Sequence, residues 1–324
     1  MRIGGNMAKL KLKKQVKVNF CILVIVIVAI IFGINKYKEY KYHQTNEYKL
    51  TLVGYTLDES KLIIDKLNDK NEEYFVNNEK NNYIIDLLNE KYFLEKYLYE
   101  YLDYKKDNKK KSNSDVVAIV NVRANKEWYD KDTVKPTNLD MGNLILVNKF
   151  NYLDSSFVPS DITNINLSFA YSTNSVTKDC NDAYITMASK AKEDGIVLLV
   201  NSSYRNYERQ ESVYKEFYYS KGVSYADQYA ARAGYSEHQT GLAIDVFTNG
   251  ASTTDTFEES DAYKWLQDHA HEYGFILRYP KDKEYLTGYS YESWHYRYLG
   301  VETATKVYES GLTYDEYYAY YLDK

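Results

Sequence analysis

Two histidines and an aspartate in the C-terminal half of the chain have the residue types of a zinc site. His238 and Asp245 are seven positions apart, and His295 follows further along the chain. A catalytic zinc takes about three nitrogen or oxygen ligands from the protein and keeps one position open for water. On one straight strand an odd offset would place His238 and Asp245 on opposite faces. The Thr240-Gly241 pair between them supplies a bend that can bring both side chains to one centre.

The other histidines fit such a site less well. The chain has only five histidines, and His43 lies far upstream in a polar segment. His269 and His271 are two positions apart on an expected helix, so they point to different sides and cannot chelate one ion together. Asp245 also interrupts the apolar run 242–247, and a lone buried carboxylate costs several kcal/mol unless a cation accompanies it.

Glu292 and Arg205 are further groups whose types could act beside a metal. Glu292 stands three positions before His295. This spacing allows its carboxylate to lie beside the metal ligand and to accept a proton from a metal-activated water. Arg205 ends an expected strand over 196–203, and its planar guanidinium suits bidentate binding of a carboxylate.

Spacing alone leaves a purely structural interpretation open. A single His-x6-Asp pair is a weak pattern, and Glu-x-x-His is also an ordinary pattern on helix surfaces. In this interpretation His238 is a turn residue, Asp245 caps a strand end, and Trp294-His295 packs in the core.

The segments around these residues predict an α+β fold. Helices are expected over 182–193, 206–219, 224–233 and 258–273, and strands over 196–200, 242–247, 275–279 and 294–298. Two short strands, over 116–122 and 144–150, are expected to lead into this region. Because helices and strands alternate without a strict βαβ order, the pattern favours α+β.

Composition narrows the classes of function. The chain has 324 residues, 44% of them hydrophobic, which is enough for a core and for more than one folded unit. Its net charge of -5 argues against a general nucleic-acid binder. Cys21 and Cys180 are too few for a thiolate zinc site, and a membrane between them would prevent a disulfide.

The N-terminal segment predicts a membrane anchor. Residues 1–17 hold six basic residues, from Arg2 to Lys17, and no acidic residue, and 18–34 is apolar apart from Asn19. As a helix this run is about 25 Å long, at the short end for a membrane span. A cleavable signal peptide is the alternative, but the run lacks a good small-x-small cleavage site. We therefore expect an uncleaved signal-anchor with its N-terminus in the cytoplasm and the rest of the chain outside.

The polar segment that follows predicts a helical stalk. Thr56 and Glu59 are spaced as a capping box, apolar residues recur at helical spacing over 84–102, and 105–112 is a charged linker. The expected organisation is a cytoplasmic tail (1–17), a transmembrane signal-anchor (18–35), a helical stalk and linker (36–115), and a catalytic domain (116–324).

Three motifs together resemble a known peptidase family. They are Ser203-Tyr204-Arg205, the phrase Gly-Tyr-Ser-Glu-His-Gln-Thr-Gly-Leu-Ala-Ile-Asp over 234–245, and Glu-Ser-Trp-His over 292–295. Their types and order resemble the VanY-type D-alanyl-D-alanine carboxypeptidases of peptidase family M15. The resemblance covers about 140–310 and is supported by Tyr-Gly-Phe-Ile-Leu-Arg-Tyr-Pro and Trp-His-Tyr-Arg-Tyr-Leu-Gly. One departure is Ser293, where related chains often have Pro.

The resemblance implies a role for each candidate residue. It implies that His238, Asp245 and His295 hold Zn²⁺, that Glu292 is the general base, and that Arg205 binds the terminal carboxylate of the substrate. It also implies a compact α+β zinc peptidase domain with a central antiparallel sheet and flanking helices.

The implied substrate is the peptide stem of cell-wall peptidoglycan, which would lose its terminal D-alanine. Gln210 and Ser236 match positions that line the substrate cleft in similar enzymes. An L,D-carboxypeptidase that acts on tetrapeptide stems is the nearest alternative. A non-catalytic wall-binding protein on the same fold is a second alternative, but such a protein has no need of Glu292. No nucleic-acid partner is expected.

Overall fold

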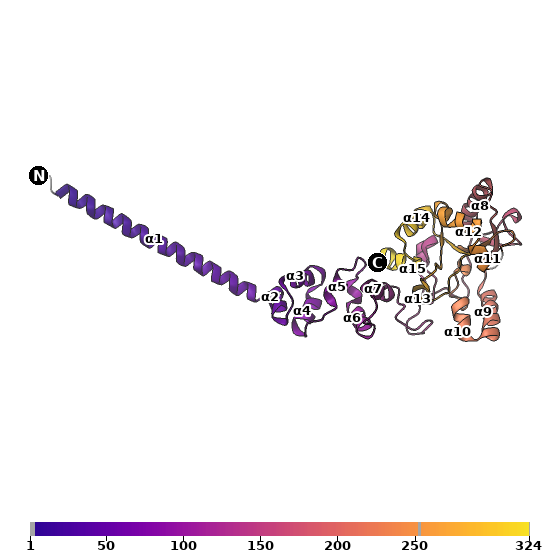
Figure 1. The fold of residues 1–324 in the computed structure, drawn as a ribbon, viewed down its shortest axis with the longest axis horizontal. Helices are drawn as coiled ribbons and strands as arrows, with labels where there is room; N and C mark the ends of the chain where they lie inside the picture. The colour runs from indigo at the N-terminus through magenta and orange to yellow at the C-terminus, as the bar shows by residue number, and fades with distance from the viewer. Residues whose placement is uncertain (1–3, 252–253, 324) are drawn as a thin grey trace. The chain divides into compact units, whose positions relative to one another are not determined.

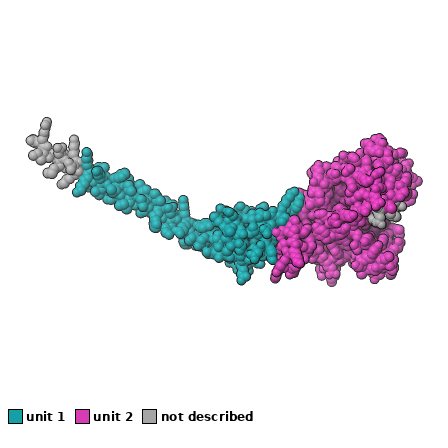
Figure 2. All heavy atoms as spheres, viewed as in Figure 1, with its two compact units in different colours: residues 1–96 teal, residues 97–324 magenta. Residues whose placement is uncertain are grey.

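The chain folds as two units, residues 1–96 and 97–324, which Figure 2 shows in different colours. The computed structural model describes residues 4–251 and 254–323 (Figure 1). Arg2, part of the expected cytoplasmic tail, lies outside the described residues. The expected stalk and linker extend to residue 115. The helix Leu98–Asp107 falls within this range but belongs to the second unit.

The apolar run near the N-terminus lies within one long helix, α1 (Gly4–His43). The part from Lys13 to His43 is long and apolar enough to cross a membrane, and its apolar stretch is not buried at all. A helix with these properties serves as a membrane anchor or as a signal sequence.

Short helices with a small core of their own complete the first unit. They are α2 (Asn46–Val53), α3 (Leu57–Lys66), α4 (Asp69–Asn77) and α5 (Ile84–Leu88). The expected capping box is confirmed at the start of α3: the Thr56 hydroxyl accepts from the Glu59 amide at 3.2 Å, and the Glu59 carboxylate accepts from the Thr56 amide at 2.7 Å. Leu50, Ile63 and Phe75 are fully buried, so apolar packing holds these short helices together.

The second unit begins with two helices. The prediction of a strand over 116–122 is therefore wrong. α6 spans Leu98–Asp107, and α7, Asn113–Asn121, occupies the segment where a strand was expected. The hydroxyl of Ser112 caps α7 by accepting from the Asp115 amide at 3.0 Å. The apolar residues of α7 are buried on all sides, and periodicity cannot distinguish such a run from a buried strand.

The second expected strand, over 144–150, is also not formed. A 3₁₀ segment (Leu139–Leu144) precedes it, and the chain then turns at Asn148. The Asn148 side-chain oxygen accepts from the amides of Phe150 and Asn151, at 3.0 and 2.9 Å. Asparagine favours such a turn because its side chain can replace a backbone acceptor, so the segment turns where an extended strand was expected.

A four-stranded antiparallel sheet forms the centre of the second unit, as expected. Its order is β5 (Leu199–Ser202), β6 (Ala243–Phe247), β8 (His295–Tyr298) and β7 (Phe275–Leu277). Two smaller sheets pair β1 (Lys135–Pro136) with β2 (Asn151–Tyr152), and β3 (Ile162–Asn164) with β4 (Ser175–Thr177).

Helices flank this sheet, as Figure 1 shows. They are α8 (Lys178–Glu193), α9 (Tyr207–Lys221), α10 (Val223–Tyr229), α11 (Thr254–Glu258), α12 (Asp261–His269), α13 (Glu284–Thr287), α14 (Val301–Ser310) and α15 (Tyr314–Tyr317). α8 and α12 share one hydrophobic core with the sheet, to which Ile244, Val246 and Tyr296 also belong. Because side chains alternate along a strand, Asp245 and His295 project from the opposite face of the sheet.

Candidate active site

The sequence-predicted site residues line one cleft in the second unit. The cleft encloses about 190 Å³. The residues are Arg205, Gln210, Ser236, His238, Asp245, Glu292 and His295.

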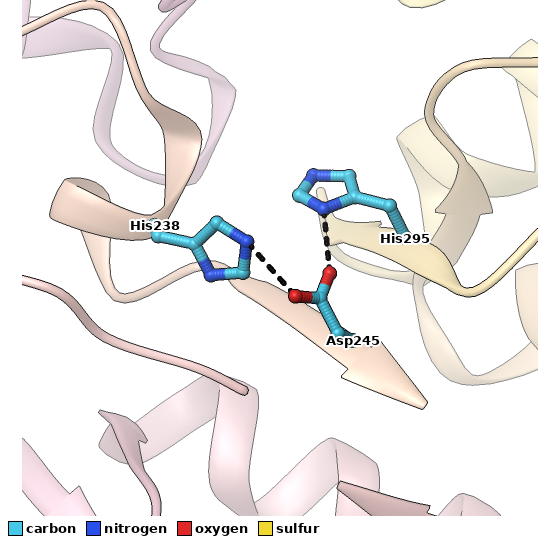
Figure 3. Close-up of side chains that lie close together, drawn as sticks. All are labelled: His238, Asp245 and His295. Carbon is cyan, nitrogen blue, oxygen red and sulfur yellow. Dashed lines mark hydrogen bonds and ion pairs between the residues drawn. The ribbon is translucent and has the colours of Figure 1, made fainter. Parts of the chain in front are cut away.

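His238, Asp245 and His295 line this cleft and lie close together (Figure 3). One nitrogen or oxygen atom from each lies within 4.8 Å of the others. The Asp245 carboxylate stands between the two rings, with Oδ2 3.4 Å from His238 Nε2 and Oδ1 2.9 Å from His295 Nδ1. The group comes from a 3₁₀ turn, Glu237–Thr240, and from the two central strands β6 and β8.

Gly241 makes the bend that brings His238 back over Asp245. It ends the 3₁₀ turn in the left-handed conformation, with φ +67°. A Cβ atom here would lie 2.8 Å from the Ile162 side chain and 3.2 Å from that of Thr177, closer than carbon atoms pack. Only glycine satisfies both the conformation and the close approach. The bend expected from Thr240-Gly241 is therefore confirmed.

The hydrogen bond of the His238 ring shows which of its two nitrogens carries the proton. The other nitrogen presents a lone pair to Asp245. His238 Nδ1 lies 2.7 Å from the backbone oxygen of Ser203. A carbonyl oxygen can only accept, so Nδ1 carries the proton. Burial and the nearby charge of Arg205 lower the pKa of His238 to about 4, so the ring is neutral near pH 7. Its Nε2 lone pair then faces a carboxylate oxygen, an arrangement that calls for a cation between them.

The second ring, that of His295, is held between acidic groups. Its Nδ1 faces Asp245, its other nitrogen faces Glu237, and the ring of Tyr279 stacks on it at 5.0 Å. Burial alone would lower the pKa of His295, but the hydrogen bond to Asp245 and the nearby carboxylate of Glu237 outweigh it and raise the pKa to about 9. Burial opposes the charge of Asp245 as well, and His238 and His295 together hold its pKa well below the usual range.

These donors fit Zn²⁺. Two imidazole nitrogens and one carboxylate oxygen are a ligand set that suits a catalytic zinc site, and all three residues line the cleft. The neutral His238 ring facing an ionised Asp245 is the observation that makes a cation fit there.

Glu292 lies beside this group without being part of it. Its Oε2 is 3.8 Å from His295 Nδ1. The backbone amide of Glu292 donates to the Tyr279 backbone oxygen at 3.1 Å, and this bond fixes the backbone at Glu292. Burial, the largest cause, raises the pKa of Glu292 to about 7, and the charge of Asp245 adds to the rise. A carboxylate with this pKa can accept and return a proton near neutral pH.

Arg205 places a positive charge at the same cleft. Its backbone amide donates to the His238 oxygen at 3.2 Å, which fixes the loop after β5 against the 3₁₀ turn. Burial lowers its pKa, while Asp245 and Glu292 act in the opposite direction. Its Nε is buried and makes no hydrogen bond to any residue that the structure describes. A guanidinium with an unused donor can bind a carboxylate of a ligand.

Gln210 and Ser236 take structural hydrogen bonds at the edge of the cleft. The side-chain amide nitrogen of Gln210, on α9, donates to the Ala231 backbone oxygen at 2.7 Å. The Ser236 hydroxyl caps the 3₁₀ turn by accepting from the His238 amide at 3.3 Å. The Gln210 side-chain oxygen has no partner among the described residues and remains able to accept a hydrogen bond.

Sequence reasoning did not single out Glu237, Tyr279 or Tyr289, which also line the cleft. Glu237 is 1% exposed, a rare state for a glutamate. Glu237 directly precedes His238, and the expected strands over 275–279 and 294–298 each contain an arginine. An acid next to a candidate ligand, together with two arginines on strands, was the signal that could have found Glu237. The rings of Tyr279 and Tyr289 pack against each other at 5.0 Å.

The remaining histidines lie elsewhere, as expected. His43 stacks on Tyr48 at 4.1 Å, and His271 stacks on Tyr308 at 3.9 Å. His269 Nδ1 lies 3.0 Å from the carboxylate of Glu272.

Known proteins share this arrangement of sequence and fold. The profile of the family described as VanY: D-alanyl-D-alanine carboxypeptidase matches residues 173–301. The D-alanyl-D-alanine carboxypeptidase of Enterococcus faecium is 34% identical over 203 residues, covering 60% of this chain and 63% of the relative. The solved structure of the LdcB LD-carboxypeptidase is 36% identical with a TM-score of 0.55, covering 60% of this chain and 94% of that one. The chain belongs to the VanY family.

Other members extend this relationship. The D-alanyl-D-alanine carboxypeptidase of Enterococcus faecalis is 41% identical over 136 residues, covering 39% of this chain and 49% of the relative. The aligned segments span from 49% to 66% of the first three curated relatives. In this member of the VanY family, His238, Asp245 and His295 form the candidate metal site.

Proposed function

We propose that this protein is a zinc D,D-carboxypeptidase that removes the terminal D-alanine from peptidoglycan stem peptides. The observation that carries the proposal is the cleft in which three candidate metal ligands, an acidic group with a pKa of about 7 and an arginine with an unused donor lie together. Family membership supports the reaction, since the family and the two enterococcal relatives carry the name D-alanyl-D-alanine carboxypeptidase.

His238, Asp245 and His295 would hold the metal, and Zn²⁺ bound there would supply Lewis-acid chemistry at the scissile carbonyl. Two of these residues lie on neighbouring strands of the central sheet, and the third is fixed by the Gly241 bend and the bond to the Ser203 oxygen. A rigid frame of this kind keeps the ligands in place while substrate enters and product leaves.

Glu292 would act as the general base and then as the general acid. Its carboxylate accepts a proton from the attacking water and returns that proton to the nitrogen of the leaving D-alanine. Its position 3.8 Å from His295 Nδ1 places it beside the metal centre, and its pKa of about 7 suits both directions of transfer.

Arg205 would bind the C-terminal carboxylate of the stem peptide. This contact makes the reaction a carboxypeptidase reaction, because a substrate without a free terminal carboxylate leaves a buried guanidinium unpaired. Gln210 and Ser236 line the same cleft and would contact the peptide next to the scissile bond.

An L,D-carboxypeptidase acting on tetrapeptide stems is a second candidate. A specific observation favours it: the LdcB LD-carboxypeptidase structure matches this chain over 94% of its own length. Both reactions use the same metal, base and carboxylate-binding groups, and they differ in the residue that precedes the terminal D-alanine.

The organisation of the chain suits a substrate outside the cell membrane. In this proposal 1–17 is a cytoplasmic tail, 18–35 is the membrane-spanning part of α1, 36–115 is a helical stalk and linker, and 116–324 is the extracellular catalytic domain. The exposed apolar stretch of α1 supports the anchor. Recovery of the mature protein from cells in a soluble, N-terminally trimmed form would contradict it.

The two candidate reactions are separated by one assay. Full-length protein, purified in detergent and loaded with Zn²⁺, is incubated with pentapeptide stems and with tetrapeptide stems, and the released D-alanine is quantified. Release from the pentapeptide alone supports the D,D reaction, and release from the tetrapeptide alone supports the L,D reaction. Release from neither by a zinc-loaded protein would contradict both.

A further inference from the structure

Glu237 is a buried carboxylate that uses only one of its two oxygens. Its Oε1 accepts from Arg278 Nε and from Arg297 Nη1, both at 2.8 Å. Its Oε2 is buried and has no hydrogen-bond partner among the described residues. One side of this carboxylate is therefore anchored, and the other is unused.

The unused oxygen faces an unused nitrogen on a candidate metal ligand. Oε2 of Glu237 lies 3.7 Å from His295 Nε2, which is also buried and without a hydrogen bond to any described residue. A charge-assisted N–H···O bond is about 2.8 Å long, so a shift of about 0.9 Å would form one. Leaving two buried polar atoms unpaired is unfavourable, which favours that shift.

We propose that Glu237 is a positioning residue for the metal centre: it accepts a hydrogen bond from His295 Nε2–H and thereby fixes Nδ1 as the nitrogen that binds the metal. This role rests on the proposed function of the site. A histidine ligand that donates its second N–H to a carboxylate is held in one tautomer and one ring orientation, and it becomes a stronger donor. The 2.9 Å approach of Nδ1 to Asp245 already points that nitrogen toward the other candidate ligands.

Two buried arginines, Arg278 and Arg297, hold Glu237 in place. Arg297 also donates to the backbone oxygens of Asn143 and Ile145, at 2.9 and 2.7 Å. Arg278 binds Asp315 of α15, with Nη1 2.5 Å from Oδ2. Both guanidiniums are completely buried. Segments that are distant in sequence therefore fix the carboxylate that faces His295.

The competing explanation is that Glu237 only neutralises Arg278 and Arg297. In that case its loss would lower the stability of the fold but leave the metal affinity of the folded protein unchanged. Asp315 offers a matched control, because it is a buried carboxylate on the same Arg278 that does not line the cleft.

The test compares Glu237→Gln with Asp315→Asn in the full-length protein in detergent. The Zn²⁺ dissociation constant is measured by competition with a chelator, and folding is checked by thermal denaturation. We expect Glu237→Gln to bind Zn²⁺ about 10- to 100-fold more weakly than the wild type, the usual cost of losing such a partner. Asp315→Asn is expected to melt at a lower temperature and to keep the wild-type affinity.

Two results would overturn the positioning role: unchanged Zn²⁺ affinity in Glu237→Gln, or an equal loss in both variants. A wild-type protein that binds no Zn²⁺ would overturn the proposed function and this role with it. When the wild type binds Zn²⁺ and Glu237→Gln binds it equally well, the proposed function stands and only the positioning role fails.

A second measurement uses the wild type alone and does not depend on a variant that folds. In zinc-loaded protein with ¹⁵N-labelled histidine, the NMR signals of His295 report which ring nitrogen is protonated. We expect a protonated Nε2 and a metal-bound Nδ1. The opposite assignment, with Nε2 bound to the metal, would overturn the role of Glu237.

Discussion

Asp245 and His295 lie directly opposite each other on the neighbouring strands β6 and β8, and their side chains approach to 2.9 Å. Opposed positions on antiparallel strands place two side chains on the same face of the sheet at close range. The strand register itself therefore brings two of the three candidate zinc ligands together. The third, His238, reaches them through the bend at Gly241.

Asp245→Asn is expected to remove zinc binding while the protein stays folded. The variant keeps the shape of the side chain but loses the charge between the two rings. We expect the Zn²⁺ affinity to fall by more than the roughly 10- to 100-fold that loss of an outer partner costs. Chelator competition measures the change. Asp282→Asn, at an exposed position outside the cleft, is the control and is expected to bind Zn²⁺ like the wild type.

Glu292→Gln is expected to separate zinc binding from turnover. The variant keeps the three candidate ligands but cannot accept a proton. We expect normal Zn²⁺ content and a fall in kcat of about 10²- to 10⁴-fold, the usual contribution of general acid–base catalysis. Glu309→Gln, exposed on α14, is expected to retain full activity. Wild-type turnover in Glu292→Gln would remove Glu292 from the role of base.

Arg205→Lys is expected to weaken recognition of the substrate's terminal carboxylate. Lysine keeps the charge but loses the planar fork that binds a carboxylate through two bonds. We expect kcat/KM for a stem peptide to fall by about 10- to 100-fold, in line with a charged hydrogen bond worth about 1.5–3 kcal/mol.

Peptides with an amidated C-terminus provide the control for Arg205. The wild type should discriminate strongly against them, and Arg205→Lys should discriminate less. Arg209→Lys, on the exposed face of α9, should leave both rates unchanged. Equal preference for free and amidated peptides in the wild type would contradict the role assigned to Arg205.

Gly241→Ala is expected to disturb both stability and zinc binding. Its left-handed backbone and the 2.8 Å approach to Ile162 leave no room for a methyl group. Gly311 has the same φ of +67°, but no atom of the described residues lies within 4 Å of the place a methyl group would take, so Gly311→Ala isolates the conformational cost. We expect Gly311→Ala to lose about 1–2 kcal/mol of stability and to bind Zn²⁺ normally. Gly241→Ala should lose more stability and bind Zn²⁺ weakly; equal behaviour of the two variants would argue against the bend as a determinant of the site.

Lys149 is expected to make the stability of the second unit depend on pH. Burial lowers its pKa to about 8 from an ordinary value of 10.5. Between these values the unfolded chain binds more protons at this residue than the folded chain does. The free energy of unfolding therefore rises with pH across the window, by up to about 1.4 kcal/mol per pH unit.

Chemical denaturation between about pH 7.5 and 10 measures this effect in the wild type and in Lys149→Met. We expect the difference in unfolding free energy between the two proteins to shift in favour of the wild type as the pH rises, because other titrating groups are common to both. A difference that stays constant over this range would contradict the lowered pKa of Lys149.

The candidate site could be located from the sequence because local features agreed with the three motifs that carry the resemblance. Thr240-Gly241 indicated the bend, and Asp245 stood out as an acid within an apolar strand. The spacing of Glu292 and His295 placed the acid beside the ligand, and the structure separates them by 3.8 Å.

The parts that were missed depend on long-range packing. The run 116–122 forms a helix because Ser112 caps it and the surrounding residues bury it on all sides, which local pattern does not reveal. Glu237 faces His295 only because arginines from β8 and from the end of β7 hold it from a distance in sequence.

The zinc dependence of D-alanine release tests the central claim most directly. Metal-free, full-length protein is titrated with Zn²⁺ in the presence of pentapeptide stem, alongside Asp245→Asn. We predict that D-alanine release rises in proportion to bound Zn²⁺, saturates at about one ion per chain, and is absent in the variant. Release that persists in the fully metal-free protein, or no release from pentapeptide and tetrapeptide stems at full zinc occupancy, would contradict the claim.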